Sequence, residues 1–429
     1  MSDSQATIIR SLDISETQYW LFDRVSTTNF SVFAPGKGKL DSKALRHSLN
    51  TLQSLYPSTQ VGIRKSADSK NLVFVRKEND IPLLIKEVGD NQWQQVVAVD
   101  AMQPFNTDDA PLLRAILYSI DENHWVFSLV FHHSAADARS GIRFFKEVFS
   151  HLGSSPIYSK RRKFKDPMHE VLPDAAVEKL AHPGALTIPE PENLPVFSGK
   201  KSEAAPKLAI LRIDQQRLKT IRHKAWDNSV SVHGVLGAIQ LKAIASLYGK
   251  FSSENIPLNL TTPADTRHYL KNQPDEADLA LYTTVLTSHL QVGENTPFWE
   301  LARAISENVK AQLNDMEGLL FYKKLSDPTQ FLKKDSALKA FSFLMQLMPQ
   351  ASVLSNVGVV ADFPMVHGIE LDYLAFTSLP SVTQTVFVSV TTFQEGMTIV
   401  MNYDSNRWEK PAFELFYSNY CNTLSSLYD

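Results

Sequence analysis

Cysteine is almost absent from this chain, because Cys421 is the only one among 429 residues. A lone cysteine cannot form an intramolecular disulfide or supply a cysteine cage for a metal ion. The N-terminal stretch Met1–Ser11 is polar and lacks the apolar core of a signal peptide. We therefore expect a protein of a reducing compartment, located in the cytoplasm.

An excess of charge of either sign is also missing. The 43 lysines and arginines nearly balance the 46 aspartates and glutamates, and the formal net charge is −3. Such a chain offers no extended basic surface to a phosphate backbone, which argues against a nucleic-acid-binding protein. Two long uncharged segments, Ala340–Ala361 and Tyr373–Gln394, are interrupted by polar residues. They predict buried or ligand-lining elements and no transmembrane segment.

The length and composition point to two globular domains. Hydrophobic residues make up 43% of the chain, and 429 residues exceed what one hydrophobic core usually supports. We predict domains at residues 1–182 and 207–429, joined by a proline-rich linker or crossover at residues 183–206. Lys160–Lys165 forms a basic run before the linker. It is either a solvated charged loop or a surface for coenzyme A phosphates or an acidic carrier protein.

Hydrophobic periodicity predicts alternating strands and helices. Residues 112–120 and 125–131 read as two strands joined by a tight polar turn, and the helix that follows has Ile142, Phe145 and Phe149 on one face. Other helices are predicted at 41–55, 93–102, 214–226, 231–247, 298–313 and 412–427, and other strands at 29–33, 61–64, 72–75, 208–213, 256–261, 353–360, 373–379, 385–392 and 397–403. This order indicates an α/β fold with mixed sheets.

A pair of histidines stands where the second of these strands ends. His132 and His133 are adjacent, and Asp137 follows at the start of the next helix. Loops at strand ends often carry active-site groups. Neighbouring residues of a strand point in opposite directions, so one histidine can face a cleft while the other is structural. Two simpler interpretations remain: Asp137 is only the N-cap of the helix, or the histidines bind a metal, although no third ligand accompanies them.

The segment Phe131–Asp137, with the sequence FHHSAAD, resembles the HHxxxDG signature of the chloramphenicol-acetyltransferase-like superfamily. That superfamily includes condensation domains of peptide synthetases, alcohol acetyltransferases and polyketide-associated acyltransferases. Further landmarks resemble the family in order along the chain, at Ser229–Leu236, Leu258–Arg267, Leu354–Gly358 and Ile399–Asp404. Ala138 replaces the usual glycine, and the DFGWG motif of the plant members is missing. The resemblance covers nearly the whole chain and favours the condensation and alcohol-acetyltransferase branches.

This resemblance implies a fold and a set of site residues. The fold would be two chloramphenicol-acetyltransferase-like subdomains with mixed sheets, arranged in a V around a central tunnel. His133 would be the general base, and His132 would support its loop. Asp137 would be a buried structural residue paired with Arg267. The substrate-binding segment would comprise Ser355, Asn356 and Gly358 and would stabilise the oxyanion, unless it is only a turn at a strand edge.

The resemblance also implies a function. We expect a free-standing, monomeric acyltransferase that moves an acyl group from acyl-CoA or an acyl carrier protein to a small-molecule or lipid-like alcohol or amine. It would use no covalent acyl-enzyme, no permanently bound cofactor and no metal. The alternative is a non-catalytic condensation-like domain that binds a carrier protein or a partner enzyme, although the presence of both His133 and Asp137 disfavours it. A metal hydrolase is a third possibility.

Overall fold

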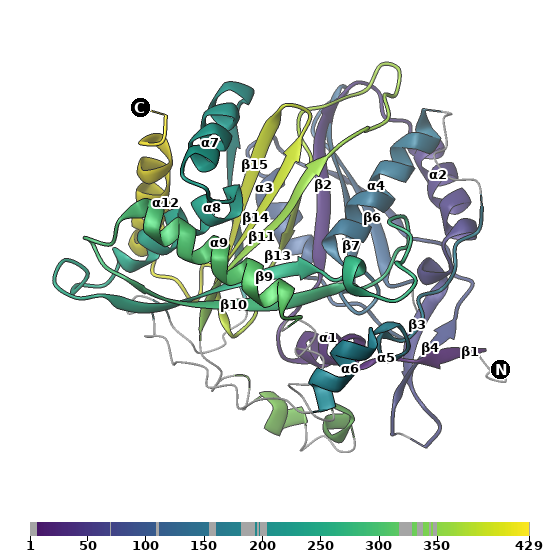
Figure 1. Ribbon diagram of the computed structural model, residues 1–429. Coiled ribbons are helices and arrows are strands. Elements are labelled where there is room, and N and C mark those ends of the chain that lie inside the picture. Colours follow the sequence, from purple (N-terminus) through teal and green to yellow (C-terminus); the bar gives the residue numbers. More distant parts are fainter. Residues whose placement is uncertain are drawn as a thin grey trace.

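Two six-stranded sheets and one three-stranded sheet build this protein. The computed structural model describes residues 7–428, apart from 69, 109–110, 154–159, 182–193, 195–196, 198–203, 317–327, 333–337, 343–344 and 346–349. Most of the predicted linker, and part of the uncharged segment 340–361, therefore lie outside the described residues. Figure 1 shows the two large sheets side by side, with helices on their outer faces. The predicted α/β fold with mixed sheets is confirmed.

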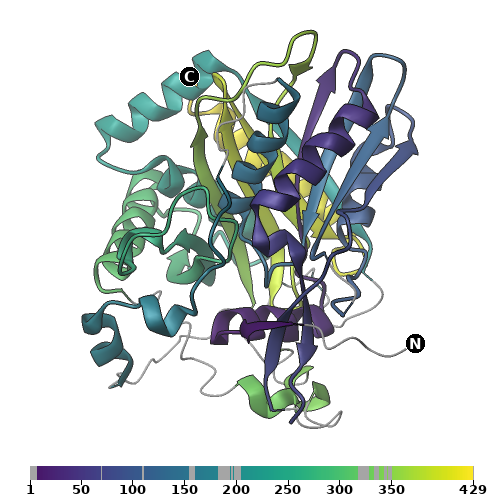
Figure 2. The ribbon, with the colours of Figure 1, turned by 90° about the vertical axis from the view of Figure 1, so that its right-hand side faces the viewer.

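The first large sheet has the strand order β12–β2–β7–β6–β5, with β13 also paired to β2. Only the β5–β6 pair is parallel among the described pairings of this sheet. Helices α2 and α4 pack against one another, and α4 packs on β2 and β7 (Figure 2). The strands are β2 (Phe30–Lys37), β5 (Leu83–Glu87), β6 (Leu113–Ser119), β7 (His124–Phe131), β12 (Glu370–Leu371) and β13 (Ala375–Ser378).

The second large sheet has the order β10–β9–β11–β14–β15–β8. Strand β11 runs parallel to both of its neighbours, and the other pairs are antiparallel. Helices α7, α8, α9 and α12 pack their apolar side chains against those of the strands in its main core cluster. The strands are β8 (Pro206–Ile213), β9 (Ile256–Asp265), β10 (Thr283–Val292), β11 (Ala351–Val360), β14 (Gln384–Phe393) and β15 (Gly396–Asp404).

Strand β13 joins the two large sheets. Its backbone pairs with Phe30–Phe33 of β2, while its outer side faces the second sheet. Ser389 of β14 donates a hydrogen bond to the Phe376 carbonyl, and Asn402 of β15 donates to the hydroxyl of Thr377 at 3.1 Å. The segment 370–378, which we assigned to the second domain from the sequence, therefore lies in a sheet otherwise made by the first. The boundaries at 183–206 stay a prediction.

Five of the helices begin at a residue whose side chain accepts a hydrogen bond from the first turn. Asp13, Asp41, Asp137, Asp214 and Ser231 each accept a backbone N–H of the first turn, the usual role of an N-cap residue. The helices are α1 (Ile14–Val25), α2 (Ser42–Leu55), α3 (Trp93–Ala101), α4 (Ala138–Leu152), α5 (Met168–Val171), α6 (Asp174–Ala181), α7 (Gln215–Asp227), α8 (Val232–Ala245), α9 (Phe298–Asn314) and α12 (Lys410–Ser425), with short 3₁₀ turns η1 (Pro57–Gln60), η2 (Arg267–Tyr269) and η3 (Pro328–Leu332).

A buried cluster of charges fixes the start of α1. Lys165 Nζ lies 2.8 Å from Asp13 Oδ2 and 3.4 Å from Glu16 Oε1, and Arg10 makes two hydrogen bonds of 2.8 Å to Glu16. Asp13, Glu16 and Lys165 are all buried. Burial by itself raises the pKa of the Asp13 carboxyl, but the ammonium of Lys165 outweighs it and holds that pKa below its ordinary value. The cluster connects α1 and the small sheet to the segment before α5. The small sheet has the strand order β1–β4–β3, with β1 at Ile8–Ser11, β3 at Val61–Lys65 and β4 at Leu72–Arg76.

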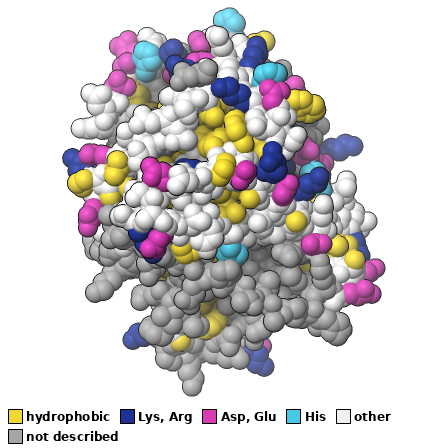
Figure 3. Space-filling model, turned by 60° about the vertical axis from the view of Figure 1, so that its left-hand side comes forward, with side chains coloured by type: hydrophobic (Ala, Val, Ile, Leu, Met, Phe, Trp, Pro, Cys, Tyr) yellow, Lys and Arg dark blue, Asp and Glu magenta, His cyan; other side chains and the backbone are white. Residues whose placement is uncertain are grey.

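The surface carries mixed charges. Figure 3 shows acidic and basic side chains interspersed around a patch of apolar ones on one face of the molecule. Within the described part of the chain, no helix has the length and apolar character needed to cross a membrane.

Candidate active site

His133 lies in the turn between β7 and α4, with aromatic rings on two sides. Its imidazole stacks on Tyr19 of α1, with ring centroids 4.1 Å apart and planes 17° apart. Phe30 of β2 approaches it at 5.1 Å with a tilt of 59°. The residue as a whole keeps partial exposure, whereas its Nδ1 atom is buried. Nε2 is therefore the ring nitrogen open to a substrate.

The surroundings of His133 favour its neutral form. Burial lowers the pKa of the imidazole to about 4, and neighbouring His132 acts in the same direction. The Asp137 carboxylate and the backbone of His133 and Ala136 act in the opposite direction but do not compensate. The imidazole is thus a neutral acceptor across the range of cellular pH.

His132 points the other way, into the protein. It is 0% exposed; its Nδ1 accepts the backbone N–H of Ser134 at 3.2 Å, and its Nε2 lies 3.6 Å from Asp23 Oδ2. The alternation of neighbouring strand-end residues explains this division, because only one of the two rings can face the same side. His132 thus contacts the loop that carries His133.

Asp137 is both a helix cap and a member of a buried network. Its Oδ1 accepts the N–H of Ser140 at 2.8 Å, as an N-cap does, and its Oδ2 accepts the N–H of Tyr282 at 2.8 Å. Arg267 Nη1 lies 3.3 Å from Asp137 Oδ2. The carboxylate is 0% exposed, and the cap and the ion pair are complementary roles of one side chain.

Arg267 is held by several partners besides Asp137. It donates to Asp265 Oδ1 at 2.8 Å and to the hydroxyl of Ser140 at 2.7 Å, and its guanidinium lies over the Tyr282 ring, 4.4 Å from the centroid. Burial would lower the pKa of Arg267, but Asp137 and Asp265 outweigh burial and raise it. This network connects α4 of the first half to β9 and β10 of the second.

Ser355, Asn356 and Gly358 lie in β11. Ser355 is buried, whereas Asn356 and Gly358 are half-buried. Asn356 Oδ1 accepts the N–H of Gly358 at 2.9 Å, and Gly358 has a φ of +79°, which glycine adopts readily. Val357, between them, packs against the core cluster that contains Phe30 and Phe131. Through Val357 the segment reaches the core cluster whose Phe30 contacts His133, although among the described residues no hydrogen bond joins it to that histidine.

The basic run Lys160–Lys165 divides into two parts. Lys165 is buried in the charge cluster of α1, and Arg162 makes an ion pair of 2.7 Å with Asp275. The interpretation as a solvated loop is therefore wrong for these two residues. Arg162 is 113 positions from Asp275 and Lys165 is 152 positions from Asp13, so no local sequence pattern indicates these pairs. Lys160, Arg161 and Lys163 are exposed.

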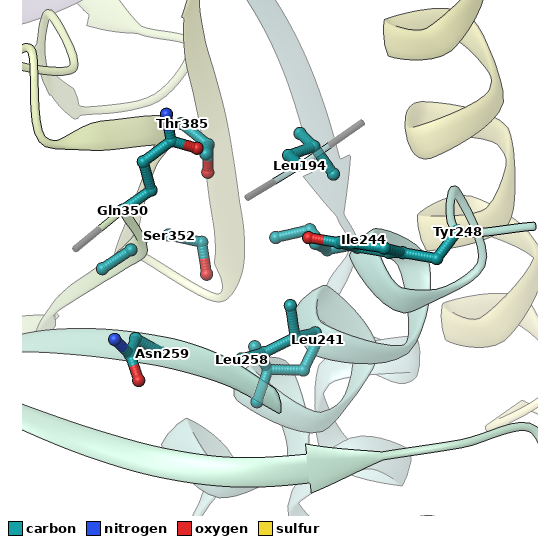
Figure 4. Close-up of a pocket in the computed structure, with 10 residues that line it drawn as sticks. Leu194, Leu241, Ile244, Tyr248, Leu258, Asn259, Gln350, Ser352 and Thr385 are labelled. Carbon is teal, nitrogen blue, oxygen red and sulfur yellow. The ribbon is translucent and has the colours of Figure 1, made fainter. Parts of the chain in front are cut away.

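A small cavity lies in the second half, between α8 and the starts of β11 and β14. Its polar side is formed by Asn259, Gln350, Ser352 and Thr385, and its apolar side by Leu194, Leu241, Ile244, Tyr248 and Leu258 (Figure 4). Its accessible volume of about 20 Å³ suits a single water molecule. His133 is not among the lining residues. Among the described residues, no three histidine, cysteine, aspartate or glutamate side chains are arranged to hold a metal ion.

Two protein-family models match the chain. The condensation domain matches residues 13–157, and the C-terminal part of phthiocerol/phthiodiolone dimycocerosyl transferase matches residues 202–403. The first contains His133 and Asp137, and the second contains Arg267 and the β11 segment. The chain belongs to the chloramphenicol-acetyltransferase-like superfamily. Condensation domains and the dimycocerosyl transferases are acyl-transferring enzymes.

Curated relatives of this superfamily member are large peptide synthetases. Surfactin synthase subunit 2 of Bacillus subtilis is 30% identical over 112 residues, 26% of this chain and 3% of the synthase. Tyrocidine synthase 3 of Brevibacillus parabrevis is 20% identical over 283 residues, 64% of this chain and 4% of the synthase. The chain thus spans only a few per cent of the length of these relatives.

Solved structures of the superfamily share the whole fold. Polyketide synthase associated protein 5 from Mycobacterium tuberculosis has a TM-score of 0.65 at 18% identity, with 98% of this chain and 99% of that one covered. The first condensation domain of the calcium-dependent antibiotic synthetase has a TM-score of 0.70 at 14% identity, with 99% and 97% covered. The predicted two-subdomain fold is confirmed by these matches.

Proposed function

We propose that this protein is an acyltransferase that moves an acyl group from a thioester to an alcohol or amine, with His133 as the general base. The observation that carries the proposal is the imidazole itself. It is neutral and half-buried, its Nε2 is open to a substrate, and it lies in a chain whose family models belong to acyl-transferring enzymes. The donor would be acyl-CoA or an acyl carrier protein.

The chemistry needs one base and one site for negative charge. Nε2 of His133 accepts the proton of the acceptor's hydroxyl or amine as that oxygen or nitrogen bonds to the thioester carbon. The tetrahedral intermediate then collapses, the carbon–sulfur bond breaks, and the thiolate takes the proton from the imidazolium. A pKa of about 4 keeps the base form present at all cellular pH values but weakens its proton affinity. The oxyanion formed nearby would stabilise the imidazolium in compensation.

The oxyanion donors would come from β11. The amide nitrogen of Asn356 makes no hydrogen bond to the described residues, and its Oδ1 is already used by Gly358. An unpaired amide N–H₂ beside a segment that reaches the histidine side of the molecule is a suitable donor for developing negative charge. Ser355 would add a hydroxyl from the same strand.

No serine or cysteine nucleophile is needed in this scheme. Cys421 lies in α12, and burial raises the pKa of its thiol, which disfavours the nucleophilic thiolate. We therefore propose direct transfer within a ternary complex.

The test is a screen of thioester donors against alcohol and amine acceptors, read by mass spectrometry. Acyl-CoA and acylated carrier protein form separate arms, so the donor class is decided by the same experiment. His133→Ala should reduce the turnover of the best pair by about 10²–10⁴-fold. His223→Ala, on the exposed face of α7, is the matched control and should leave the rate unchanged. A His133→Ala protein that turns over at the wild-type rate would show that His133 is not the base.

A further inference from the structure

The pairing between β11 and β14 is irregular close to the start of both strands. Ala351 lies opposite Gln384, but Val353 lies opposite Phe387. Two residues of β14 therefore stand opposite the single Ser352 of β11, which is the arrangement of a β-bulge. A bulge interrupts the hydrogen-bonded ladder and changes the direction in which the side chains of the longer strand point.

The bulge brings Thr385 to the face of the sheet that the helices cover. Val386, the next residue, belongs to the core cluster under those helices, and regular alternation would send Thr385 to the opposite face. Thr385 instead lines the small cavity together with Leu241 and Ile244 of α8. Its backbone carbonyl accepts the indole N–H of Trp408 at 2.7 Å. The carbonyl at the bulge is thus satisfied by a side chain.

Three buried oxygen atoms that line this cavity make no hydrogen bond to the described residues. They are Ser352 Oγ, Thr385 Oγ1 and Gln350 Oε1. Ser352 is 3% exposed and Thr385 is 5% exposed. Figure 4 shows these three side chains on the left of the view and Leu194 and Tyr248 on the right. An unpaired polar group in the interior is costly, and native proteins satisfy nearly all of them, so these oxygens require a hydrogen-bonding partner.

The size and the lining of the cavity select that partner. Its accessible volume of about 20 Å³ is enough for one water molecule, which needs two to four polar partners. A water molecule donates two hydrogen bonds, and it also accepts one from a hydroxyl, so it can serve all three oxygens at once. No acidic side chain is among the lining residues. Calcium and magnesium ions take six or more oxygen ligands, which this cavity does not offer.

We propose that one ordered water molecule binds in this cavity and bridges Gln350 and Ser352 to Thr385. The water connects β11 to β14 at the point where the extra residue interrupts their ladder. It therefore anchors the start of the strand that carries Ser355 and Asn356 further along. The inference does not depend on His133 or on the proposed activity.

A high-resolution crystal structure of the full chain tests the site directly. We expect one peak of electron density that lies about 2.6–3.2 Å from each of the three oxygens. Absence of density between them would overturn the inference. Hydroxyls of Ser352 and Thr385 that instead donate to protein acceptors would overturn it too.

Thermal melts of Thr385→Val give a second test, because the two explanations predict changes of opposite sign. If the hydroxyl binds the water, its removal takes away a hydrogen bond, and the Tm should fall by about 1–4 °C. If the hydroxyl has no partner at all, its removal relieves a desolvation cost, and the Tm should rise. A rise in Tm would therefore contradict the proposal.

The double variant Ser352→Ala/Thr385→Val leaves Gln350 as the one proposed ligand. Its crystal structure should show no water in the cavity, because apolar cavities stay dry. A water that persists there would mean that the two hydroxyls do not hold it. Ser288→Ala is the matched control, since the hydroxyl of Ser288 in β10 is also buried without a hydrogen bond to the described residues but does not line the cavity. The water should remain in that variant, and its loss would refute the assigned ligands.

Discussion

Removing the carboxylate of Asp137 should destabilise the protein more than removing its partner Arg267. Asp137 is 0% exposed and accepts two buried backbone N–H groups, from Ser140 and Tyr282, in addition to the guanidinium. Breaking a buried ion pair costs about 3–5 kcal/mol, and losing an N-cap costs about 1 kcal/mol more. We therefore expect Asp137→Ala to lower the free energy of unfolding by about 4–6 kcal/mol.

Arg267→Ala leaves both acidic partners with other donors. Asp137 keeps its two backbone N–H groups, and Asp265 keeps Arg139, whose Nη1 lies 2.6 Å from it. We expect a loss of about 2–4 kcal/mol. The double variant should lose about 1–3 kcal/mol less than the two single losses together, because neither charge is then left alone.

Equilibrium urea unfolding, followed by far-ultraviolet circular dichroism, measures all three variants. Arg139→Ala is the control, because Arg139 also pairs with Asp265 across the two halves but is 50% exposed, and its loss should stay within about 1 kcal/mol. Strictly additive losses would mean that Asp137 and Arg267 do not interact. A loss of only about 1 kcal/mol in Asp137→Ala would reduce that residue to a helix cap.

Three further predictions follow from the same geometry. The acid limb of the pH profile of kcat/KM should have its midpoint near pH 4, because His133 acts as the neutral base and burial lowers its pKa to about 4. A midpoint near 6.5 would contradict this prediction. Lys165→Met should cost about 3–5 kcal/mol in urea unfolding at neutral pH, because it leaves Asp13 buried without its cation. Since the folded-state pKa of Asp13 lies below its ordinary 3.8, this deficit should shrink as the pH falls below about 4, and a deficit that is the same at pH 7 and pH 3 would argue against the pair. Gly358→Ala should lower the free energy of unfolding by only about 1–2 kcal/mol in thermal or urea melts. The φ of +79° disfavours alanine, but an added Cβ would meet no atom within 4 Å. A much larger loss would indicate a contact that this geometry does not contain.

The elements with a clear hydrophobic period could be predicted from the sequence. The strand expected at 125–131 is β7, and the helix expected after it is α4, with Ile142, Phe145 and Phe149 buried. Strand β10 was missed because its buried positions include Thr284 and Ser288, which break the apolar alternation. Strand β5 was missed because it is a sheet edge with exposed apolar side chains.

The candidate site was predictable only where family landmarks marked it. Asp137 and Arg267 are 130 residues apart, and no local pattern relates them. The stacking of Tyr19 on His133 could not be predicted, because it depends on how α1 sits against the end of β7. Asp13 and Glu16 form a capping box at the start of α1, and their buried partner Lys165 lies 152 positions after Asp13, too far for a local pattern to relate them.

Strand β13 has a consequence for biosynthesis. Ser378 of β13 donates a hydrogen bond to the carbonyl of Asn29, 349 positions earlier in the chain. At about 5–20 residues per second, a ribosome needs about 20–70 s to make the intervening chain. During that time the edge of β2 has no partner, and an unpaired edge is a site for aggregation. We expect the first large sheet to close only near the end of translation, so a nascent or truncated chain that ends before residue 375 should depend on chaperones even though all of β2, β5, β6 and β7 has been synthesised.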